Sequence, residues 1–230
     1  MADVMHVHGA IYDKAGILHR DISCNNVLFY RTNKHPYVRG LLIDFDHAVD
    51  CSDKQRNRRL DRSGTLPFMS INNLAGNFGW VSGLDDWEST LYLMCWIATY
   101  GFNSNQAPDE KVRAKLRIRA WCEGPLDRIV DSKRSSLSTK AFFDLIVREF
   151  LSKLSEIGLL KKLVRGLRST LIDDTELDPE FRGTVALYDE DGEKLVSDPF
   201  FMRKKKEREF MKSLRSVLRQ FSNEAMLLIE

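Results

Sequence analysis

The segment from residue 84 to residue 100, LDDWESTLYLMCWIATY, constrains the fold more than any other part of the chain. It opens with Asp85 and Asp86, and acidic residues in a first turn interact favourably with the helix dipole. The residues that follow are apolar on nearly every face, which is typical of a helix buried on all sides. We therefore expect a mainly α-helical fold in which the other elements pack around this helix.

Before this segment, the sequence predicts one helix over residues 1–15. Val4, Val7, His8, Ile11 and Ala15 recur at helical spacing, and Gly16 then gives a stop signal. His6 and His8 fall on different faces of such a helix, so we do not expect them to share a metal ion.

Two apolar runs follow, VLFY (27–30) and GLLIDF (40–45). They predict a small β-hairpin whose long connection is RTNKHPYVR. Residues 46–66 are polar and irregular, and we expect them to form an exposed loop.

Amphipathic helices are predicted after residue 100. KVRAKLRIRAW and the long run from Ser138 to Leu167 both have helical periodicity, with a break near Gly158. Further on, TVALYDEDGEKLV resembles a hairpin, and the last segment carries an apolar stripe from Phe210 to Phe221. We divide the chain into a domain over residues 1–170 and an extension over 171–230.

The strongest chemical signal is HRDISCNN, residues 19–26. It places a carboxylate, Asp21, five residues before an amide, Asn26. A carboxylate can orient the proton of an attacking hydroxyl, and an amide oxygen can hold Mg²⁺. The bland alternative is a chance combination of polar residues in a loop.

Three further features follow in order and weaken that alternative. Asp44 leaves an apolar strand in LLIDFD, where a carboxylate can meet a metal ion, although capping of a strand end is also common. GTLPFMS occupies residues 64–70, and Asp86 opens the buried helix.

Together these motifs resemble the fungal-type protein kinase family over residues 5–100. HRDISCNN fits the catalytic-loop pattern H-R-D-x-x-x-x-N, LLIDFD the metal-binding D-F-G position, and GTLPFMS the end of an activation loop. The resemblance implies the large C-terminal lobe of a protein kinase, with Asp86 bracing the catalytic loop from beneath. It also implies Mg²⁺ and ATP as cofactors.

The resemblance assigns roles to six residues. Asp21 becomes the catalytic base, Asn26 and Asp44 the Mg²⁺ ligands, and Arg20 the residue that steadies the activation loop. Thr65 lies where Ser/Thr kinases keep a hydroxyl against the catalytic aspartate, which favours a Ser/Thr kinase. Ser23 lies where many such kinases carry a lysine that neutralises the γ-phosphate, and serine is usual there in the fungal-type family.

Two departures from the kinase pattern matter. Only eighteen residues precede His19, so the Gly-rich loop, the ATP-anchoring lysine and the rest of the N-terminal lobe are absent from the sequence. We expect a truncated chain that is weakly active or inactive. In addition, Asn72 replaces the glutamate that in kinases pairs with a buried arginine, which puts the order of the substrate-binding loop in question.

The alternative function is a catalytically inactive kinase-lobe scaffold that docks on a partner through the face an N-lobe would cover. The chain has 35 basic and 33 acidic residues, so net charge selects neither nucleic acid nor a membrane as partner. The basic run from Arg203 to Arg219 is more simply a solvated helix face. We expect a protein substrate or partner protein, no membrane partner and no nucleic acid.

The four dispersed cysteines suggest reduced thiols and an intracellular location, cytoplasmic or nuclear. Arginines 56, 58, 59 and 62 lie in the expected activation segment. One reading is a solvated loop. The other is that a phosphate on Ser52, Ser63 or Thr65 pairs with these arginines or with Arg20 and orders the loop.

Overall fold

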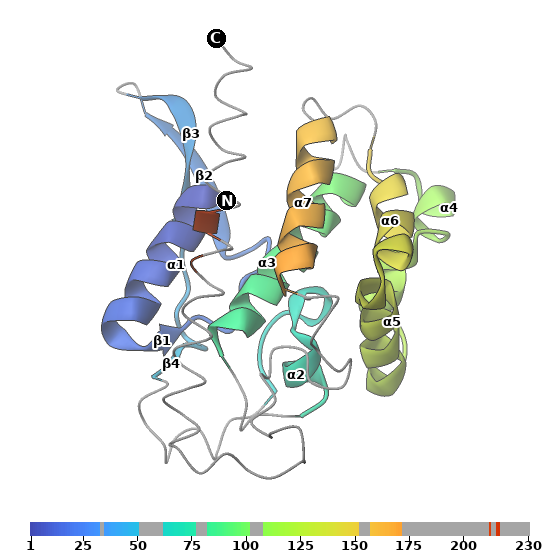
Figure 1. Ribbon diagram of the computed structural model, residues 1–230, viewed down its shortest axis with the longest axis horizontal. Helices are drawn as coiled ribbons and strands as arrows, with labels where there is room; N and C mark the ends of the chain where they lie inside the picture. Colours follow the sequence, from blue (N-terminus) through green and yellow to red (C-terminus); the bar gives the residue numbers. More distant parts are fainter. Residues whose placement is uncertain are drawn as a thin grey trace.

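The structure is a computed structural model and describes residues 1–32, 35–50, 62–76, 82–101, 108–151, 157–171, 212 and 215–216. This part of the chain is mainly α-helical, as expected, with two small two-stranded antiparallel sheets (Figure 1). The α-helices are α1 (Ala2–Ala15), α2 (Ile71–Leu74), α3 (Gly83–Tyr100), α4 (Glu110–Arg113), α5 (Leu126–Ser138), α6 (Lys140–Arg148) and α7 (Ile157–Leu171). The 3-10 helices are η2 (Leu66–Phe68) and η4 (Arg117–Trp121), and the strands are β1 (Ile17–Leu18), β2 (Val27–Thr32), β3 (His35–Leu42) and β4 (Val49–Asp50).

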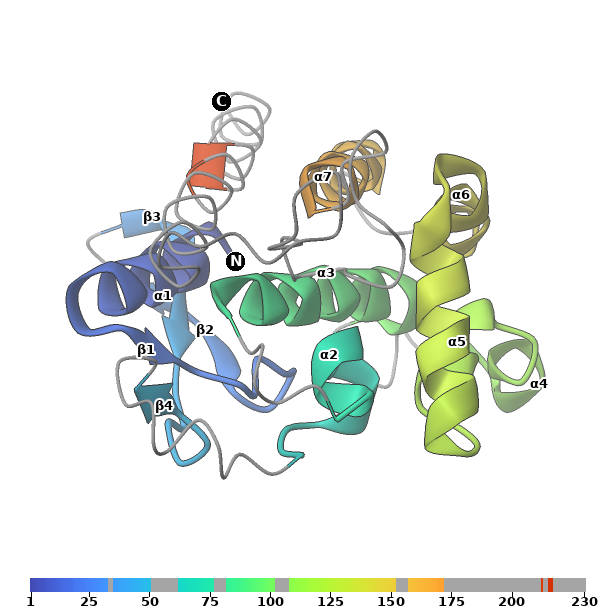
Figure 2. The same cartoon turned by 60° about the horizontal axis from the view of Figure 1, so that its bottom comes forward.

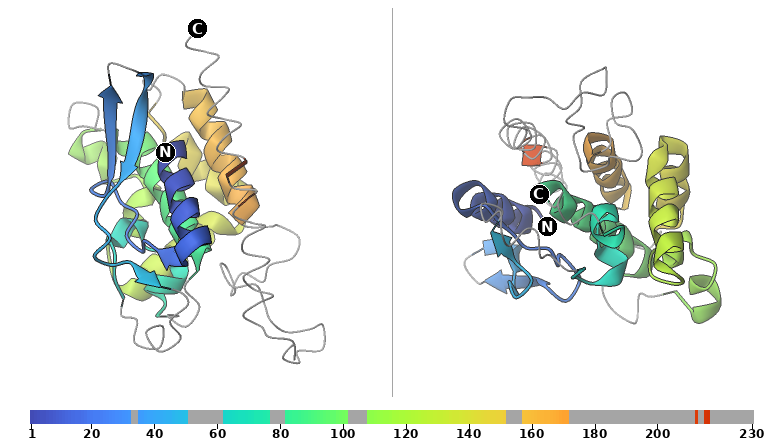
Figure 3. Two further views of the ribbon diagram at one scale, coloured as in Figure 1. Left: turned by 90° about the vertical axis from the view of Figure 1, so that its left-hand side faces the viewer. Right: turned by 90° about the horizontal axis from the view of Figure 1, so that it is seen from below.

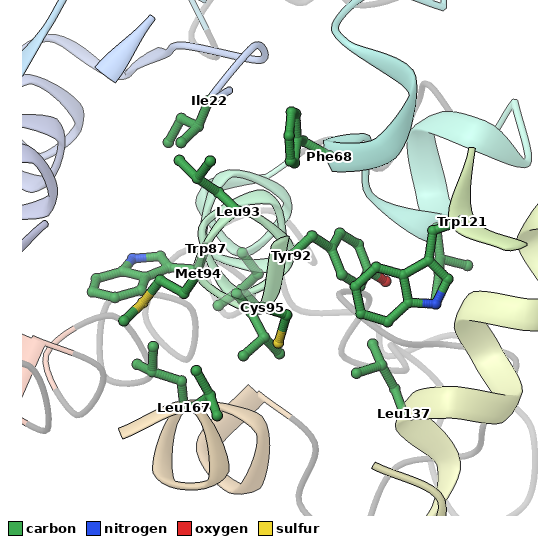
Figure 4. Close-up of a cluster of buried hydrophobic side chains, with 14 of the residues drawn as sticks. Ile22, Phe68, Trp87, Tyr92, Leu93, Met94, Cys95, Trp121, Leu137 and Leu167 are labelled. Atoms are coloured by element: carbon green, nitrogen blue, oxygen red, sulfur yellow. The ribbon is translucent and has the colours of Figure 1, made fainter. Parts of the chain in front are cut away.

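Helix α3 is the centre of the fold, which confirms the reading of its apolar sequence. A capping box starts the helix: the Ser82 hydroxyl accepts from the backbone N–H of Leu84, and the Asp85 carboxylate accepts from the backbone N–H of Ser82 at 2.7 Å. Figure 2 shows α3 running through the molecule with α7 on one side and α2 on the other. In Figure 4, Ile22, Phe68, Leu167 and Trp121 approach α3 from different directions.

Helix α1 and the β2–β3 hairpin form one flank of α3. Gly16 ends α1 in the left-handed conformation at φ 68°, so the glycine stop signal is confirmed. The hairpin lies alongside α1 (Figure 3). Gly40 permits this contact, because a Cβ there would lie 2.9 Å from the Val4 side chain. Asp3 also accepts from the backbone N–H of Gly40 at 3.0 Å.

Two expectations for the segment between residues 27 and 66 are wrong. The hairpin strands reach Thr32 and start again at His35, so the long connection expected from the sequence is mostly strand. Within the expected exposed loop, β4 pairs with β1, and the Val49 side chain is buried. Residues 51–61, which include three of the four clustered arginines, lie outside the described residues.

The helices after α3 also differ from expectation. The helix predicted over residues 111–121 is divided into α4 and η4. The predicted long helical run is interrupted after Arg148, and Gly158 lies inside α7. Helix α5 was not anticipated, because only part of its buried face is apolar.

Of the predicted extension after Leu171, the structure describes Lys212, Arg215 and Ser216 alone, so its hairpin and its apolar stripe lie outside the described residues. Arg215 donates to Asp13 of α1 at 2.9 Å, and its guanidinium lies against Gly9. Among the helices that the structure describes, none is both long enough and apolar enough to cross a bilayer.

Candidate functional site

Asp86 at the start of α3 holds the loop between β1 and β2 from below. Its Oδ2 accepts from the backbone N–H of His19 at 2.9 Å, and its Oδ1 accepts from the backbone N–H of Arg20 at 2.9 Å. The His8 ring, from α1, bonds Oδ2 at 2.7 Å. Three segments that lie far apart in the sequence therefore meet on one carboxylate. The contacts with His19 and Arg20 agree with the bracing position that the resemblance implied for Asp86, whereas the contact with His8 was not expected.

The charge of this carboxylate is stabilised although it is fully buried. Burial alone would raise the pKa of Asp86, but the hydrogen bond and charge of His8 and the bond from the His19 amide outweigh it. The net result is a pKa below the ordinary value. Asp86 is thus an anionic anchor for the loop at neutral pH.

His19 connects this loop to the next one. Its Nδ1 accepts from the backbone N–H of Asp21 at 3.3 Å, so Nε2 carries the proton and donates to the carbonyl of Ile43 at 2.9 Å. The ring of Phe45 packs edge-on against the His19 ring, with centroids 4.7 Å apart. His19 therefore ties the Asp21 loop to the segment that carries Asp44.

Both carboxylate oxygens of Asp21 have hydrogen-bond donors. Oδ1 accepts from the backbone N–H and from the hydroxyl of Thr65, each at 2.8 Å. Oδ2 accepts from the side-chain amide of Asn26 at 2.9 Å, and the same amide donates to the backbone carbonyl of Asp21. The carboxylate orientation is consequently fixed from two sides.

Asn26 and Asp44 lie on neighbouring strand ends. The backbone N–H of Ile43 donates to the carbonyl of Asn26 at 3.0 Å, so Asp44 follows directly after a residue bonded to Asn26. Asn26 is buried, whereas the Asp44 side chain is exposed. Because the Asn26 NH₂ group donates to Asp21, its amide oxygen is the atom that remains to accept or to bind a cation.

Backbone strain is concentrated in the same two loops. Among the described residues other than glycine, Arg20 and Asp44 alone have positive φ, at 67° and 62°. Such conformations cost about 1–3 kcal/mol each and persist where the surrounding structure imposes them. Here the Asp86 carboxylate holds Arg20, and the Asp44 carboxylate accepts from the backbone N–H of Asp46 at 3.3 Å.

Gly64 allows the third segment to reach Asp21. Its φ is 113°, and a Cβ at this position would lie 2.8 Å from the carbonyl oxygen of Arg20. No residue with a side chain fits that space without movement of the backbone. The glycine of GTLPFMS thus brings Thr65 next to Asp21.

The structure brings Asp21, Asn26 and Thr65 into direct contact and places Asp44 beside them through the backbone. Arg20 joins the site by its backbone, and its side chain is half-buried. Ser23 is fully buried, and its hydroxyl has no hydrogen-bond partner in the part of the chain that the structure describes. Ser23 is therefore not exposed to solvent, unlike Asp44. The catalytic roles of all these residues remain predictions.

Two charged residues missed in the sequence hold the segment after Thr65. Lys133 of α5 is fully buried and donates to the carbonyls of Met69 and Pro67 at 2.6 and 3.0 Å. Glu88 of α3 accepts from the backbone N–H of Ile71 at 2.9 Å. Burial lowers the pKa of Lys133 to about 7, and the charge of Glu88 opposes this shift.

Asn72, the departure noted in the sequence, is also buried. Its NH₂ group has no hydrogen-bond partner among the described residues. Arg168 is a buried arginine, and its guanidinium donates to the backbone carbonyl of Leu137 at 2.8 Å. Nevertheless Lys133 and Glu88 bond the backbone on either side of Ser70, so this segment is held by other means.

The donor set near Asp44 consists of oxygen atoms, the ligands that Mg²⁺ prefers. Within the described ranges there is no group of three or more His, Cys, Asp or Glu side chains that could hold a metal ion. A magnesium site here would therefore use the Asn26 amide oxygen and the Asp44 carboxylate, with water and phosphate oxygens as the other ligands. The residues present fit such a site.

No curated protein and no solved structure matches the chain. A family model described as fungal protein kinase matches residues 1–98, the segment that runs from α1 into α3 and contains every motif of the site. Residues 1–98 are therefore similar to the fungal protein kinase family, and the match covers less than half of the chain.

Proposed function

We propose that the site supports transfer of the γ-phosphoryl group of Mg-ATP to a serine or threonine hydroxyl of a protein. One observation carries this proposal: both oxygens of Asp21 are fixed, by Thr65 and by Asn26, in a loop that Asp86 anchors to the core. Phosphoryl transfer depends mainly on positioning and on charge neutralisation, and this arrangement supplies a positioned carboxylate.

Asp21 is the residue that meets the substrate hydroxyl. Oδ1 accepts two hydrogen bonds from Thr65 and Oδ2 accepts one from Asn26, so Oδ2 keeps a lone pair that can accept the proton of a hydroxyl. The Thr65 hydroxyl at 2.8 Å supports the Ser/Thr type, by analogy with the family. Magnesium would neutralise phosphate charge when bound to Asn26 and Asp44.

The exposed apolar face of the β2–β3 hairpin supports nucleotide binding, because it offers a surface for the base. Leu28 pairs with Leu41, and with Tyr30 they lie on one face of the hairpin. These three side chains are 44–47% exposed, which is unusual for three neighbouring large apolar residues. Since Leu28 follows Asn26 closely in the chain, this apolar face is near the proposed Mg²⁺ ligands and suits the flat, weakly polar surface of adenine.

Residues 1–230 supply only part of a nucleotide site. The eighteen residues before His19 form α1 and the start of β1, and they contain no Gly-rich loop and no strand lysine. Loss of one preorganised electrostatic group costs ~10²–10³ in rate, so the lack of several predicts slow turnover and weak ATP affinity for this chain by itself. We place the activity inside the cell, in the cytoplasm or nucleus, with a protein as substrate.

Thermal unfolding with and without Mg-ATP tests the nucleotide proposal. We expect millimolar Mg-ATP to raise the Tm of the wild type and of Asp46→Ala but not of Asp44→Ala. Asp46 is a matched control, because it is an exposed carboxylate two residues from Asp44. Equal shifts in all three proteins would exclude Asp44 as a ligand, and the absence of a shift in the wild type would reject nucleotide binding.

A second candidate is a catalytically inactive scaffold that binds a partner protein. The exposed apolar face of Leu28, Tyr30 and Leu41 favours it, because exposed apolar patches often mark interaction sites. This reading predicts no effect of Mg-ATP on the Tm of the wild type. It also predicts that Leu28→Asp abolishes partner binding without lowering stability.

A further inference from the structure

We propose that Lys133 is a positioning residue that sets Thr65 against Asp21 by fixing the turn formed by residues 65–71. Lys133 belongs to α5, which packs against α2 (Figure 2). This inference rests on the proposed function, because it gives the Thr65–Asp21 contact a purpose.

The contacts of Lys133 are concentrated on one irregular stretch of backbone. Its Nζ donates to the carbonyls of Met69, Pro67 and Leu66 at 2.6, 3.0 and 3.5 Å. These carbonyls belong to η2 and the residue after it, where no regular helix supplies donors for them. An ammonium group has three N–H donors, and here three carbonyls are in reach of them.

The charge of Lys133 is balanced by neighbours on α3. The Nζ lies 4.1 Å from the centroid of the Tyr92 ring, in cation–π geometry. Tyr92 in turn donates its hydroxyl to Glu88, which also holds the backbone N–H of Ile71. Lys133 and Glu88 thus fasten the same turn, one through its carbonyls and one through an amide.

A charged lysine is an unusual choice for this position if its only role is to fill space. A buried cation has a desolvation cost, and apolar residues of similar volume often stabilise a protein as much or more. Unlike leucine or methionine, Lys133 has N–H donors, and these donors orient the backbone carbonyls of residues 66–69. The other end of this turn is Thr65, whose amide and hydroxyl both bond Asp21.

Amide hydrogen exchange measured by NMR on the full chain tests this role without any need for catalysis. In Lys133→Met, which keeps side-chain length but removes the donors, we expect the Thr65 and Ile71 amides to exchange at least about tenfold faster. That factor corresponds to the loss of one hydrogen bond to a charged group. The amides of α3 from residue 91 to residue 95 should keep their protection. Lys140→Met is the matched control, because Lys140 is exposed on the next helix.

Two outcomes would overturn the proposal. Unchanged exchange at Thr65 would show that Lys133 does not position it, and equal acceleration in α3 would show a general effect on stability.

If Lys133→Met does not fold, Glu88→Gln gives a second test, since it keeps an acceptor for Ile71 but removes the charge that balances Lys133. We then expect faster exchange at both Thr65 and Ile71, and unchanged exchange would refute the proposal. Failure of the wild type to bind Mg-ATP would reject the proposed function but would leave these exchange results interpretable.

Discussion

Replacement of Asp86 by asparagine tests whether the loop that carries Asp21 depends on the start of α3. In either orientation of the new amide, one oxygen is replaced by an NH₂ group that faces a backbone N–H of His19 or of Arg20. That N–H becomes a buried donor without an acceptor, which costs about 1–3 kcal/mol. The partly ionic contact with His8 is lost as well.

Together these losses predict destabilisation by about 3–5 kcal/mol, the range for breaking a buried ion pair from one side. For a chain of this length the Tm should fall by roughly 10 °C. Urea unfolding at pH 6, followed by tryptophan fluorescence, gives the free energy. Hydrogen exchange of the Arg20 amide should also become faster, by a factor that corresponds to a similar free energy, because the acceptor of this amide is weakened or lost.

Asp85→Asn is the matched control, since it makes the same substitution one residue earlier in the same buried turn. Burial, with smaller contributions from Glu88 and Asp86, raises the pKa of Asp85 to about 7, so its carboxyl is mostly protonated at pH 6. Asparagine then replaces a neutral group, and we expect a change below about 1 kcal/mol. Equal effects of the two substitutions, or a loss below about 1 kcal/mol in Asp86→Asn, would refute the bracing role of Asp86.

Three further predictions follow from single contacts. Gly64→Ala should lower the free energy of unfolding by on the order of 3 kcal/mol, because backbone strain at φ 113° is combined with a Cβ 2.8 Å from the Arg20 carbonyl oxygen. Gly124→Ala is the control: φ there is 107° but the Cβ would meet open space, so the loss should be about 1 kcal/mol. Equal losses in urea unfolding would contradict the close approach at Gly64. Because the pKa of Asp85 is raised, the folded state keeps a proton between pH 4 and 7 that the unfolded state has lost. The free energy of unfolding should therefore fall by on the order of 4 kcal/mol as the pH rises through this window. Asp85→Asn should lack this fall, and parallel pH profiles of the two proteins would exclude Asp85 as its source. Asp86 has the opposite effect on the pH dependence of stability: because its pKa is lowered, it contributes stability that is lost as the pH falls below about 4. Asp86→Asn should lack this loss of stability in acid. An unchanged decrease of stability below pH 4 in this variant would contradict the prediction.

Much of the site could be predicted because its residues act through local sequence patterns. Asp86 opens a helix whose apolar faces identify it as central, and Asp21 and Asn26 have the spacing of one loop. Gly64 and Thr65 stand in a recognisable run of seven residues. These signals survive in a single sequence because each depends on neighbours a few residues away.

The parts that could not be predicted depend on contacts between distant segments. Lys133 interrupts the buried stripe of α5, Ile129, Val130 and Leu137, so the periodicity of this helix is weak. A lysine is normally solvent-exposed, and its partners here lie more than sixty residues earlier in the chain. The hairpin was predicted too short for a different reason: the polar residues of its outer half gave no apolar alternation, yet the strands continue through them.

The most direct test of the central claim is paramagnetic broadening by Mn²⁺ bound with ATP, read from the amide NMR signals of the wild-type chain. If Asp21, Asn26 and Asp44 surround one metal–phosphate complex, the signals of these three residues should broaden together at the same Mn²⁺ concentration, and Asp44→Ala should abolish the broadening at all three. Broadening confined to other parts of the chain, or broadening at Asp44 alone, would contradict the convergence on which the proposed phosphoryl transfer depends.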